Sequence, residues 1–313
     1  MGVGSGHGKS ILFGEHFVVY GLPSLAVGID AVTLAKVTRS SSSGWTLDDR
    51  RPEVEGYKEQ KMDEQTVSIN NVLRHLKIDT SRQGIHIELG GDLICASGFG
   101  ASAASCVSLA RALNEEFNLG LGDAEVNEAA FEGEKGYHGT PSGIDNTAST
   151  YGGLVWYVRD LHGGPPTFSP ITLDGSINFI IASTGITAST TEVVGDVRAK
   201  KEANPKWFTR IANEYEHLVK DSLSALRALK LEKIGHLMNR NHELLQELTV
   251  SCEELDNLVT IARDNGALGA KLTGTGRGGN MIAIASDTVT RDKIAQALEK
   301  GGAAFVIKTS FGA

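Results

Sequence analysis

The sequence predicts a fold of the α+β class. Segments with strand-like and helix-like patterns are mixed along its 313 residues, without the strict alternation of a doubly wound parallel sheet. No internal repeat of the kind found in solenoids is visible. A chain of this length is expected to form one large or two medium domains. We place the boundary in the turn-rich stretch 165–175, which gives an N-terminal domain over residues 1–172 and a C-terminal domain over residues 173–313.

The N-terminal half begins with an apolar, β-branched run. Residues 10–19 are expected to form a strand, a tight turn at Gly14-Glu15-His16 and a second strand. The same patterns predict further strands at 26–38, 84–89 and 154–158, helices at 63–76, 105–117 and 123–137 with Asp123 as the N-cap of the last, and polar turns at 40–44, 139–143 and 163–166.

The C-terminal half is richer in helices. A short buried strand is expected at 178–183, and residues 206–248 hold two or three helices rich in Leu, Ala and charged residues. The remaining predicted elements are a helix at 253–265, strands at 270–272 and 281–285 on either side of a glycine-rich loop, a helix at 292–300 and a strand at 304–308.

Composition excludes several classes of protein. The net charge is −8 and no long basic run is present, so neither nucleic acid nor an anionic membrane is an expected partner. No apolar run approaches the length of a membrane-spanning helix. The three cysteines, Cys95, Cys106 and Cys252, lack metal-ligand spacing and are interpreted as reduced thiols of a cytoplasmic protein.

A glycine-rich turn at residues 97–105 joins an apolar run to the helix at 105–117. Gly98 and Gly100 allow the backbone to turn tightly and to approach a ligand. The N–H groups at the start of the helix have no intrahelical partner and favour an anion, usually phosphate. Ordinary strand–helix connections carry the same pattern. The turn is not a Walker A loop, because no Gly-Lys-Ser/Thr follows its glycines.

Several polar residues surround this turn in the sequence. Lys9, at the start of a buried strand, either faces a pocket or lies on the surface. Ser102 is suited to ligate Mg²⁺ beside a phosphate, or to cap the helix. Glu134 and Asp145, separated by a rigid turn, either converge on one metal or hydroxyl group, or are a solvated side chain and a cap.

A second glycine-rich loop lies at residues 271–280. Its four glycines, Gly274, Gly276, Gly278 and Gly279, fall within six positions between two strand-like runs. Such a loop can lie close to a ligand or to another backbone, or it is simply a flexible hairpin.

Together these segments resemble the GHMP small-molecule kinases, with the family's motifs in order over nearly the full length. Residues 9–16 with 18–21, and residues 138–146, resemble the members that act on mevalonate. The resemblance implies a mixed α+β N-terminal domain, a ferredoxin-like C-terminal domain, and transfer of a phosphoryl group from ATP, with Mg²⁺, to the C5 hydroxyl of mevalonate. The oligomeric state, monomer or homodimer, is left open.

The resemblance also assigns roles to residues. It makes Asp145 the catalytic carboxylate with Lys9 as its partner, and Ser102 and Glu134 the Mg²⁺ ligands. It places Gly98, Gly100, Ala101, Ser102, Ala103, Gly274, Gly276 and Gly278 beside the nucleotide, and Glu15, His16 and Thr187 in the substrate pocket. Arg159 is our candidate for the substrate carboxylate because it ends the strand that follows Asp145, and an exposed strand-end arginine is the alternative.

The sequence departs from the family pattern at several positions. The usual loop reads Pro-x-Gly-x-Gly-Leu-Gly-Ser-Ser, and Ile94, Ala96, Phe99 and Ala101 replace its Pro, first Gly, Leu and first Ser. Ser102 is kept, so phosphate binding is expected to survive with one hydroxyl contact fewer. Where many members have Gly, Arg277 either adds charge near the phosphates or points to solvent.

Three other functions compete with this interpretation. A dinucleotide-binding fold would place a strand directly after the helix at 105–117, whereas a second helix is expected from Asp123. A related kinase of the family could act on a different alcohol. A non-catalytic metabolite sensor on the same fold would not need the set Lys9, Ser102, Glu134 and Asp145, which this sequence retains together.

Overall fold

The computed structural model describes residues 1–95 and 97–312, and the chain forms two compact units. The first unit comprises residues 1–9 and 28–152, and the second comprises residues 10–27 and 153–313. Residues 10–27 and 153–172, placed by the predicted division in the N-terminal domain, therefore belong to the second unit. As a domain division, the boundary at 172/173 stays a prediction.

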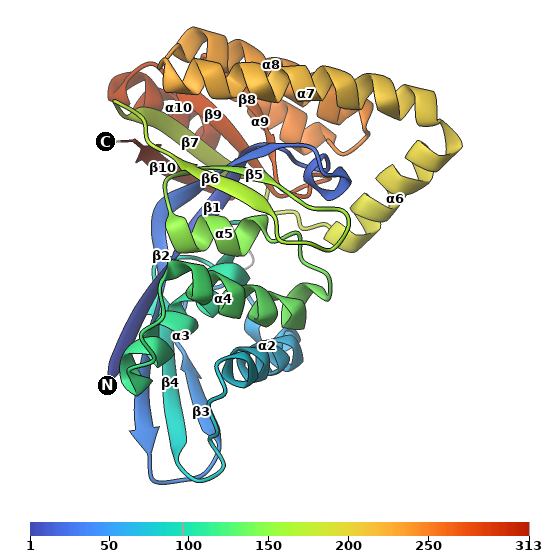
Figure 1. The fold of residues 1–313 in the computed structure, drawn as a ribbon. Coiled ribbons are helices and arrows are strands. Elements are labelled where there is room, and N and C mark those ends of the chain that lie inside the picture. Colours follow the sequence, from blue (N-terminus) through green and yellow to red (C-terminus); the bar gives the residue numbers. More distant parts are fainter. Residues whose placement is uncertain (96, 313) are drawn as a thin grey trace. The chain divides into compact units, whose positions relative to one another are not determined.

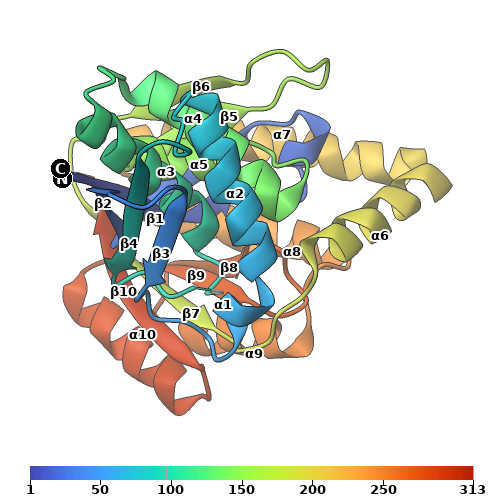
Figure 2. The same ribbon diagram turned by 90° about the horizontal axis from the view of Figure 1, so that it is seen from below.

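The first unit combines a sheet with helices. Its strands follow the order β3-β4-β2, with β3 parallel to β4, β4 antiparallel to β2, and β1 paired with β2. Figures 1 and 2 both show helices α2, α3 and α4 together beside these strands. The elements are β1 Gly2–Phe13, β2 Ser24–Ser40, β3 Trp45–Asp49, β4 Gly84–Gly91, α1 Tyr57–Gln60, α2 Met62–His75, α3 Ala101–Phe117, α4 Asp123–His138 and α5 Ile144–Tyr151, the first two strands continuing into the second unit.

The core of the first unit lies between its sheet and these helices. Apolar side chains from β2, β4, α2, α3 and α4 form one buried cluster, which includes Val37, Ile87, Val72, Val107 and Ala129, all fully buried. Removing this apolar surface from water is the main stabilising contribution to the unit.

Strand β1 packs against α3 with almost no space between the two backbones. A Cβ atom on Gly2, Gly4 or Gly6 would lie 2.1–2.2 Å from a carbonyl oxygen of Ala112, Ser108 or Ala104, respectively. Two residues of strand span about the same length as four residues of helix, so each alternate glycine meets the next turn of α3. The contacts run toward the N-terminus of α3 as β1 runs toward Lys9.

The second unit has a four-stranded antiparallel sheet in the order β10-β7-β9-β8. Residues 24–27 of β2 also pair with β5, which pairs with the edge strand β6. Helices α7 and α8 run side by side (Figure 1). The elements are the 3₁₀ turn η1 Val18–Tyr20, β5 Leu154–Val158, β6 Thr167–Ile171, β7 Ile177–Ser183, α6 Thr190–Ala203, α7 Pro205–Arg227, α8 Leu231–Glu247, α9 Glu253–Asp264, β8 Gly269–Thr273, β9 Asn280–Ala285, α10 Thr288–Lys300 and β10 Phe305–Phe311.

The predicted α+β class is confirmed, and most predicted elements are present with their ends moved by a few residues. Two local predictions were wrong. Residues 18–20 form the 3₁₀ turn η1 instead of a second strand. Asp123 is the first residue of α4 and not its N-cap; the N-cap is Gly122, whose N–H donates to Glu125 Oε2 at 2.6 Å.

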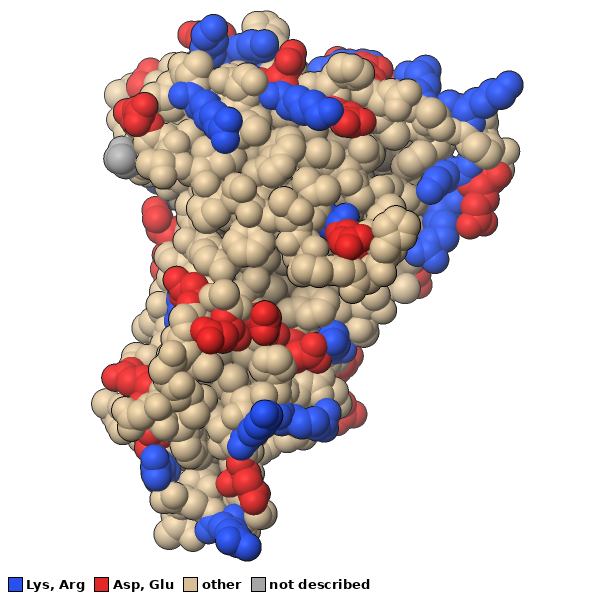
Figure 3. Space-filling model, in the orientation of Figure 1, with Lys and Arg blue, Asp and Glu red and all other residues tan. Residues whose placement is uncertain are grey.

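Charged side chains of both signs lie on one face of the molecule. On the face drawn in Figure 3, Lys and Arg are interspersed with Asp and Glu and with uncharged residues. Within the described ranges, no helix is both long and apolar enough to cross a bilayer.

Candidate active site

A buried lysine meets a carboxylate in the first unit. Lys9 lies in β1 with only 7% of its side chain exposed, and its Nζ lies 3.0 Å from Oδ1 of Asp145, which is 29% exposed. Asp145 is in the first turn of α5, where the helix dipole favours a negative charge. The structure therefore excludes a surface lysine and brings together the two residues predicted as catalytic, leaving the carboxylate accessible.

The glycine-rich turn ends at the start of α3. Gly100 is the N-cap of this helix in the left-handed conformation, with φ +69°, and a Cβ atom on it would lie 2.8 Å from Cγ of Lys9. Lys9 N–H donates to Phe99 O at 2.8 Å, which fixes the turn against β1. The first intrahelical bond runs from Ala104 N–H to Gly100 O, so the preceding amides of the helix start are available to an anion.

Glu134 lies beside this helix start. Its side chain, on α4, is 1% exposed, and no described residue gives its Oε1 a hydrogen-bond partner. Burial and the negative charge of Asp145 raise the pKa of Glu134 to about 8, although the Ser102 hydroxyl and Lys9 oppose the shift. Glu134 is therefore not the solvated side chain of the alternative interpretation.

Ser102 is the second residue of α3, so it does not cap the helix. Its Oγ lies 3.5 Å from Nε2 of His138, and the same nitrogen lies 3.7 Å from Oε2 of Glu134. A buried carboxylate oxygen without a partner, a hydroxyl and a second carboxylate nearby are oxygen ligands of the kind that Mg²⁺ takes together with phosphate oxygens and water. The residues present fit this ion.

Glu15 and His16 lie in the second unit, in the turn after β1. Both Glu15 and Lys271 of β8 have fully buried side chains and form an ion pair. Burial raises the pKa of Glu15 and lowers that of Lys271, each against the effect of its partner. The sequence analysis missed Lys271, although a lysine inside the apolar run of β8 is a signal that could have found it.

His16 holds the second glycine-rich loop. Its Nε2 donates to Thr275 O at 2.7 Å, which leaves Nδ1 as an acceptor, buried and without a hydrogen-bond partner among the described residues. Burial lowers the pKa of His16, so the ring is neutral near pH 7. This predicted substrate residue thus offers one unused acceptor.

The loop between β8 and β9 is ordered by its contacts. Gly276 has φ +78°, and a Cβ atom there would lie 2.0 Å from Val250 O, so only glycine fits. Arg277 Nη1 lies 2.5 Å from Asp196 Oδ2 on α6, and its Nε donates to Thr249 O at 3.2 Å. The Arg277 guanidinium is therefore held by Asp196 and Thr249 and does not simply point to solvent. Whether it adds charge near the phosphates stays a prediction.

The other predicted residues lie at less defined positions. Arg159 directly follows β5 and is half-buried, and no described residue pairs with its guanidinium. Thr187 is exposed in the segment between β7 and α6. Of the departures from the family loop, Phe99 and Ala101 are buried, whereas Ala96 lies outside the described residues.

Two regions of the chain match the models of one protein family. Residues 67–153 match the GHMP kinases N terminal domain, and residues 222–304 match the GHMP kinases C terminal region. The crystal structure of L. major mevalonate kinase in complex with R-mevalonate is 44% identical, with a TM-score of 0.93 over 100% of this chain and 96% of that chain.

Further relatives match over similar lengths. The mevalonate kinase of Thermococcus sibiricus is 31% identical over 96% of this chain and 94% of its own length. The crystal structure of mevalonate kinase from methicillin-resistant Staphylococcus aureus is 27% identical, with a TM-score of 0.75 over 100% of this chain and 99% of that one. With both family regions matched and a relative 31% identical over 96% of its length, the chain belongs to the GHMP kinases, which are ATP-dependent small-molecule kinases.

Proposed function

We propose that this chain transfers the γ-phosphoryl group of ATP to the C5 hydroxyl of mevalonate. The observation that carries the proposal is the buried Lys9 paired with the accessible Asp145 at 3.0 Å, beside the start of α3. The substrate is taken from the similarity to a structure described as a complex with R-mevalonate, which is 44% identical over the whole chain.

In this proposal the first unit supplies the reacting groups. Asp145 accepts or orients the proton of the attacking hydroxyl, and the Lys9 ammonium, 3.0 Å away, stabilises the oxygen as it becomes negative. The free amides at the start of α3 hold phosphate oxygens. Mg²⁺, held by Glu134 and Ser102, would neutralise charge on the transferring phosphates. Positioning and charge stabilisation are the main requirements of phosphoryl transfer.

His16 and Arg159 are the proposed contacts to the alcohol. The unused Nδ1 acceptor of His16 suits a hydroxyl group of the substrate. We assign the substrate carboxylate to Arg159, whose guanidinium has no partner among the described residues. An arginine–carboxylate pair is bidentate and charge-assisted, so it distinguishes mevalonate from neutral alcohols.

A coupled kinase assay over a panel of alcohols tests the proposal. Mevalonate should be turned over far faster than phosphomevalonate, galactose or homoserine. The Arg159→Ala variant should raise the KM for mevalonate by roughly 10- to 100-fold, the equivalent of losing a charge-assisted pair, while the KM for ATP stays nearly constant. Preference for another alcohol would reject mevalonate as the substrate. Equal effects of Arg159→Ala on the two KM values would reject only the assignment of the substrate carboxylate to Arg159.

A further inference from the structure

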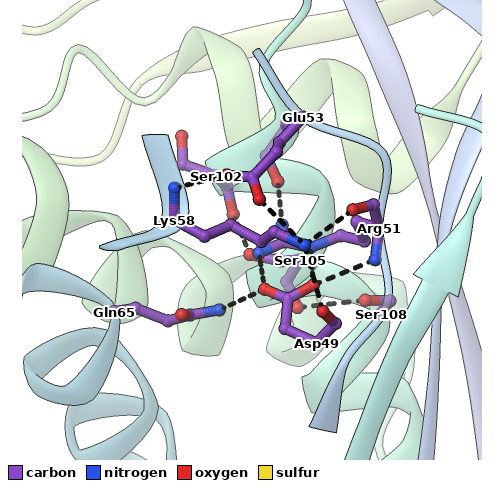
Figure 4. A network of polar contacts seen from close by, with 9 residues as sticks. Asp49, Arg51, Glu53, Lys58, Gln65, Ser102, Ser105 and Ser108 are labelled. Atoms are coloured by element: carbon purple, nitrogen blue, oxygen red, sulfur yellow. Dashed lines mark hydrogen bonds and ion pairs between the residues drawn. The ribbon is translucent and has the colours of Figure 1, made fainter. Parts of the chain in front are cut away.

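A second arginine–carboxylate pair, distinct from the residues discussed so far, lies next to the glycine-rich turn. Arg51 follows β3, and its side chain is only 4% exposed (Figure 4). Its Nε and Nη2 donate to the two carboxylate oxygens of Asp49, at 2.9 and 2.5 Å. The third nitrogen, Nη1, donates to Ala101 O at 3.3 Å, in the first turn of α3. One planar guanidinium therefore joins the end of β3 to the start of this helix.

The backbone around Arg51 also leads to the turn. Arg50 N–H donates to Leu89 O at 2.8 Å and so continues the pairing of β3 with β4. Beyond Arg51, Cys95 N–H donates to Pro52 O at 2.8 Å and Val54 N–H donates to Cys95 O at 3.1 Å. The segment 50–54 is thus hydrogen-bonded to Cys95, which precedes Ser97 of the glycine-rich turn by two residues.

Other polar side chains fix the pair from its far side. Gln65 Nε2 of α2 donates to Asp49 Oδ2 at 2.9 Å. Lys58 Nζ donates to the carbonyl oxygens of Asp49, at 3.1 Å, and Arg51, at 2.9 Å, and lies 3.4 Å from Glu53 (Figure 4). Every strong donor of this network has an acceptor, so the cluster has one defined geometry.

We propose that Arg51 is a positioning residue for the nucleotide phosphates, which it serves by fixing the first turn of α3 through Ala101. Lys9 N–H holds the turn from β1 at Phe99, and Arg51 holds it from β3, so the phosphate-facing amides lie between two fixed points. The inference rests on the proposed function, because it assumes that this helix start binds ATP.

The role of Arg51 is geometric and not electrostatic. Asp49 neutralises the guanidinium at two atoms, which leaves little net charge to act on a phosphate. A lysine at position 51 would keep the positive charge, but it cannot hold both carboxylate oxygens and Ala101 O at once. The Arg51→Lys variant therefore separates position from charge.

The chain offers a matched control one residue away. Arg50 pairs with Asp48, its Nε and Nη2 both meeting the single oxygen Oδ2, but it is 70% exposed and has no hydrogen bond to α3 among the described residues. Arg50→Lys makes the same chemical change outside the network. Calorimetric titration with MgATP and amide hydrogen exchange over residues 97–104 are then measured for both variants and the parent.

Arg51→Lys should speed exchange in 97–104 and raise the Kd for MgATP by up to about tenfold, because binding must then order the helix start without the charge-assisted hydrogen bond to Ala101 O. Arg50→Lys should change the Kd by less than about twofold. Equal Kd values and equal exchange in the two variants would overturn the proposal. If Arg51→Lys does not fold, Lys58→Met should show the same direction with a change of about threefold, and its absence is equally decisive.

These measurements do not need turnover. An active parent enzyme with an unchanged Kd in Arg51→Lys would refute only the positioning role. A parent that binds MgATP but phosphorylates no mevalonate would refute the proposed substrate and leave the Arg51 result interpretable. If hydrogen exchange over residues 97–104 is identical in the parent and in all variants, the contact between Arg51 and Ala101 does not determine the structure of the turn.

Discussion

Two lysine–carboxylate pairs of the same chemical type lie in different surroundings. In the first unit, Lys9 is buried but Asp145 is 29% exposed. In the second unit, Lys271 and Glu15 are both fully enclosed. A pair with an accessible oxygen can act on a ligand, whereas an enclosed pair can only hold its own chain segments together. The solvent exposure of the carboxylate therefore separates a pair that can act on a ligand from a pair that only stabilises the fold, and residue type and spacing do not predict this exposure.

The comparison is tested most strongly by removing the charge of Asp145. Asp145→Asn keeps the shape of the side chain and should lower kcat by about 10³-fold, because the group that accepts or orients the hydroxyl proton is lost. MgATP affinity and the thermal midpoint should change little. Asp123→Asn is the control, since Asp123 is a 56% exposed carboxylate that pairs with Arg111, and neither residue belongs to the proposed site. Full activity of Asp145→Asn would remove Asp145 from the mechanism.

The enclosed pair should respond in stability. Lys271→Met leaves the Glu15 carboxylate buried without a partner and should lower the free energy of unfolding by about 3–5 kcal/mol, measured by urea denaturation. The double variant Glu15→Gln with Lys271→Met should recover most of this loss. Lys220→Met, which breaks an exposed pair with Glu216, should cost less than about 1 kcal/mol. A loss in Lys271→Met no larger than in Lys220→Met would contradict the distinction.

A smaller effect is expected in the pH dependence of metal binding. The pKa of Glu134 is raised to about 8, so its acidic form is favoured in the folded protein and the stability that this form provides is lost as pH rises toward 8. Binding of Mg²⁺ requires the carboxylate form of Glu134, whose fraction rises with pH up to about 8. The Mg²⁺ concentration for half-maximal activity should therefore fall by up to about tenfold for each unit by which the pH is raised toward 8. In Glu134→Gln this pH dependence should vanish. An unchanged slope in the variant would place the titrating group elsewhere.

The sequence predicted the strongly periodic helices well, because their apolar faces repeat over several turns. It missed α5, since Ile144–Tyr151 is rich in Asn, Thr and Ser, which have low helix propensity, and the helix depends on burial instead. It also missed the first eight residues of β1. Their glycines are unfavourable in an isolated strand and become useful only where a helix backbone approaches.

The candidate site was predicted by resemblance, but its partners were not. The family pattern indicates Lys9 and Asp145, and their pairing in space confirms that they lie together. Nothing in the pattern indicates that Lys271 meets Glu15 or that Arg51 meets Ala101, because each contact joins segments far apart in the chain. Such contacts depend on tertiary structure, which a single sequence does not reveal by periodicity.

The glycine contacts between β1 and α3 determine where Lys9 lies along the helix, because Lys9 is in the same strand. From Gly2 to Lys9 the strand advances about 23 Å, and its alternate glycines are each seated against a successive turn of α3. An alanine at Gly4 cannot be absorbed by a local side-chain movement, because the atom it meets is backbone. The strand must shift or tilt, and Lys9 moves with it relative to Gly100. A substitution at Gly4, remote from the proposed phosphate site, would thereby change the distance between Lys9 and the start of α3.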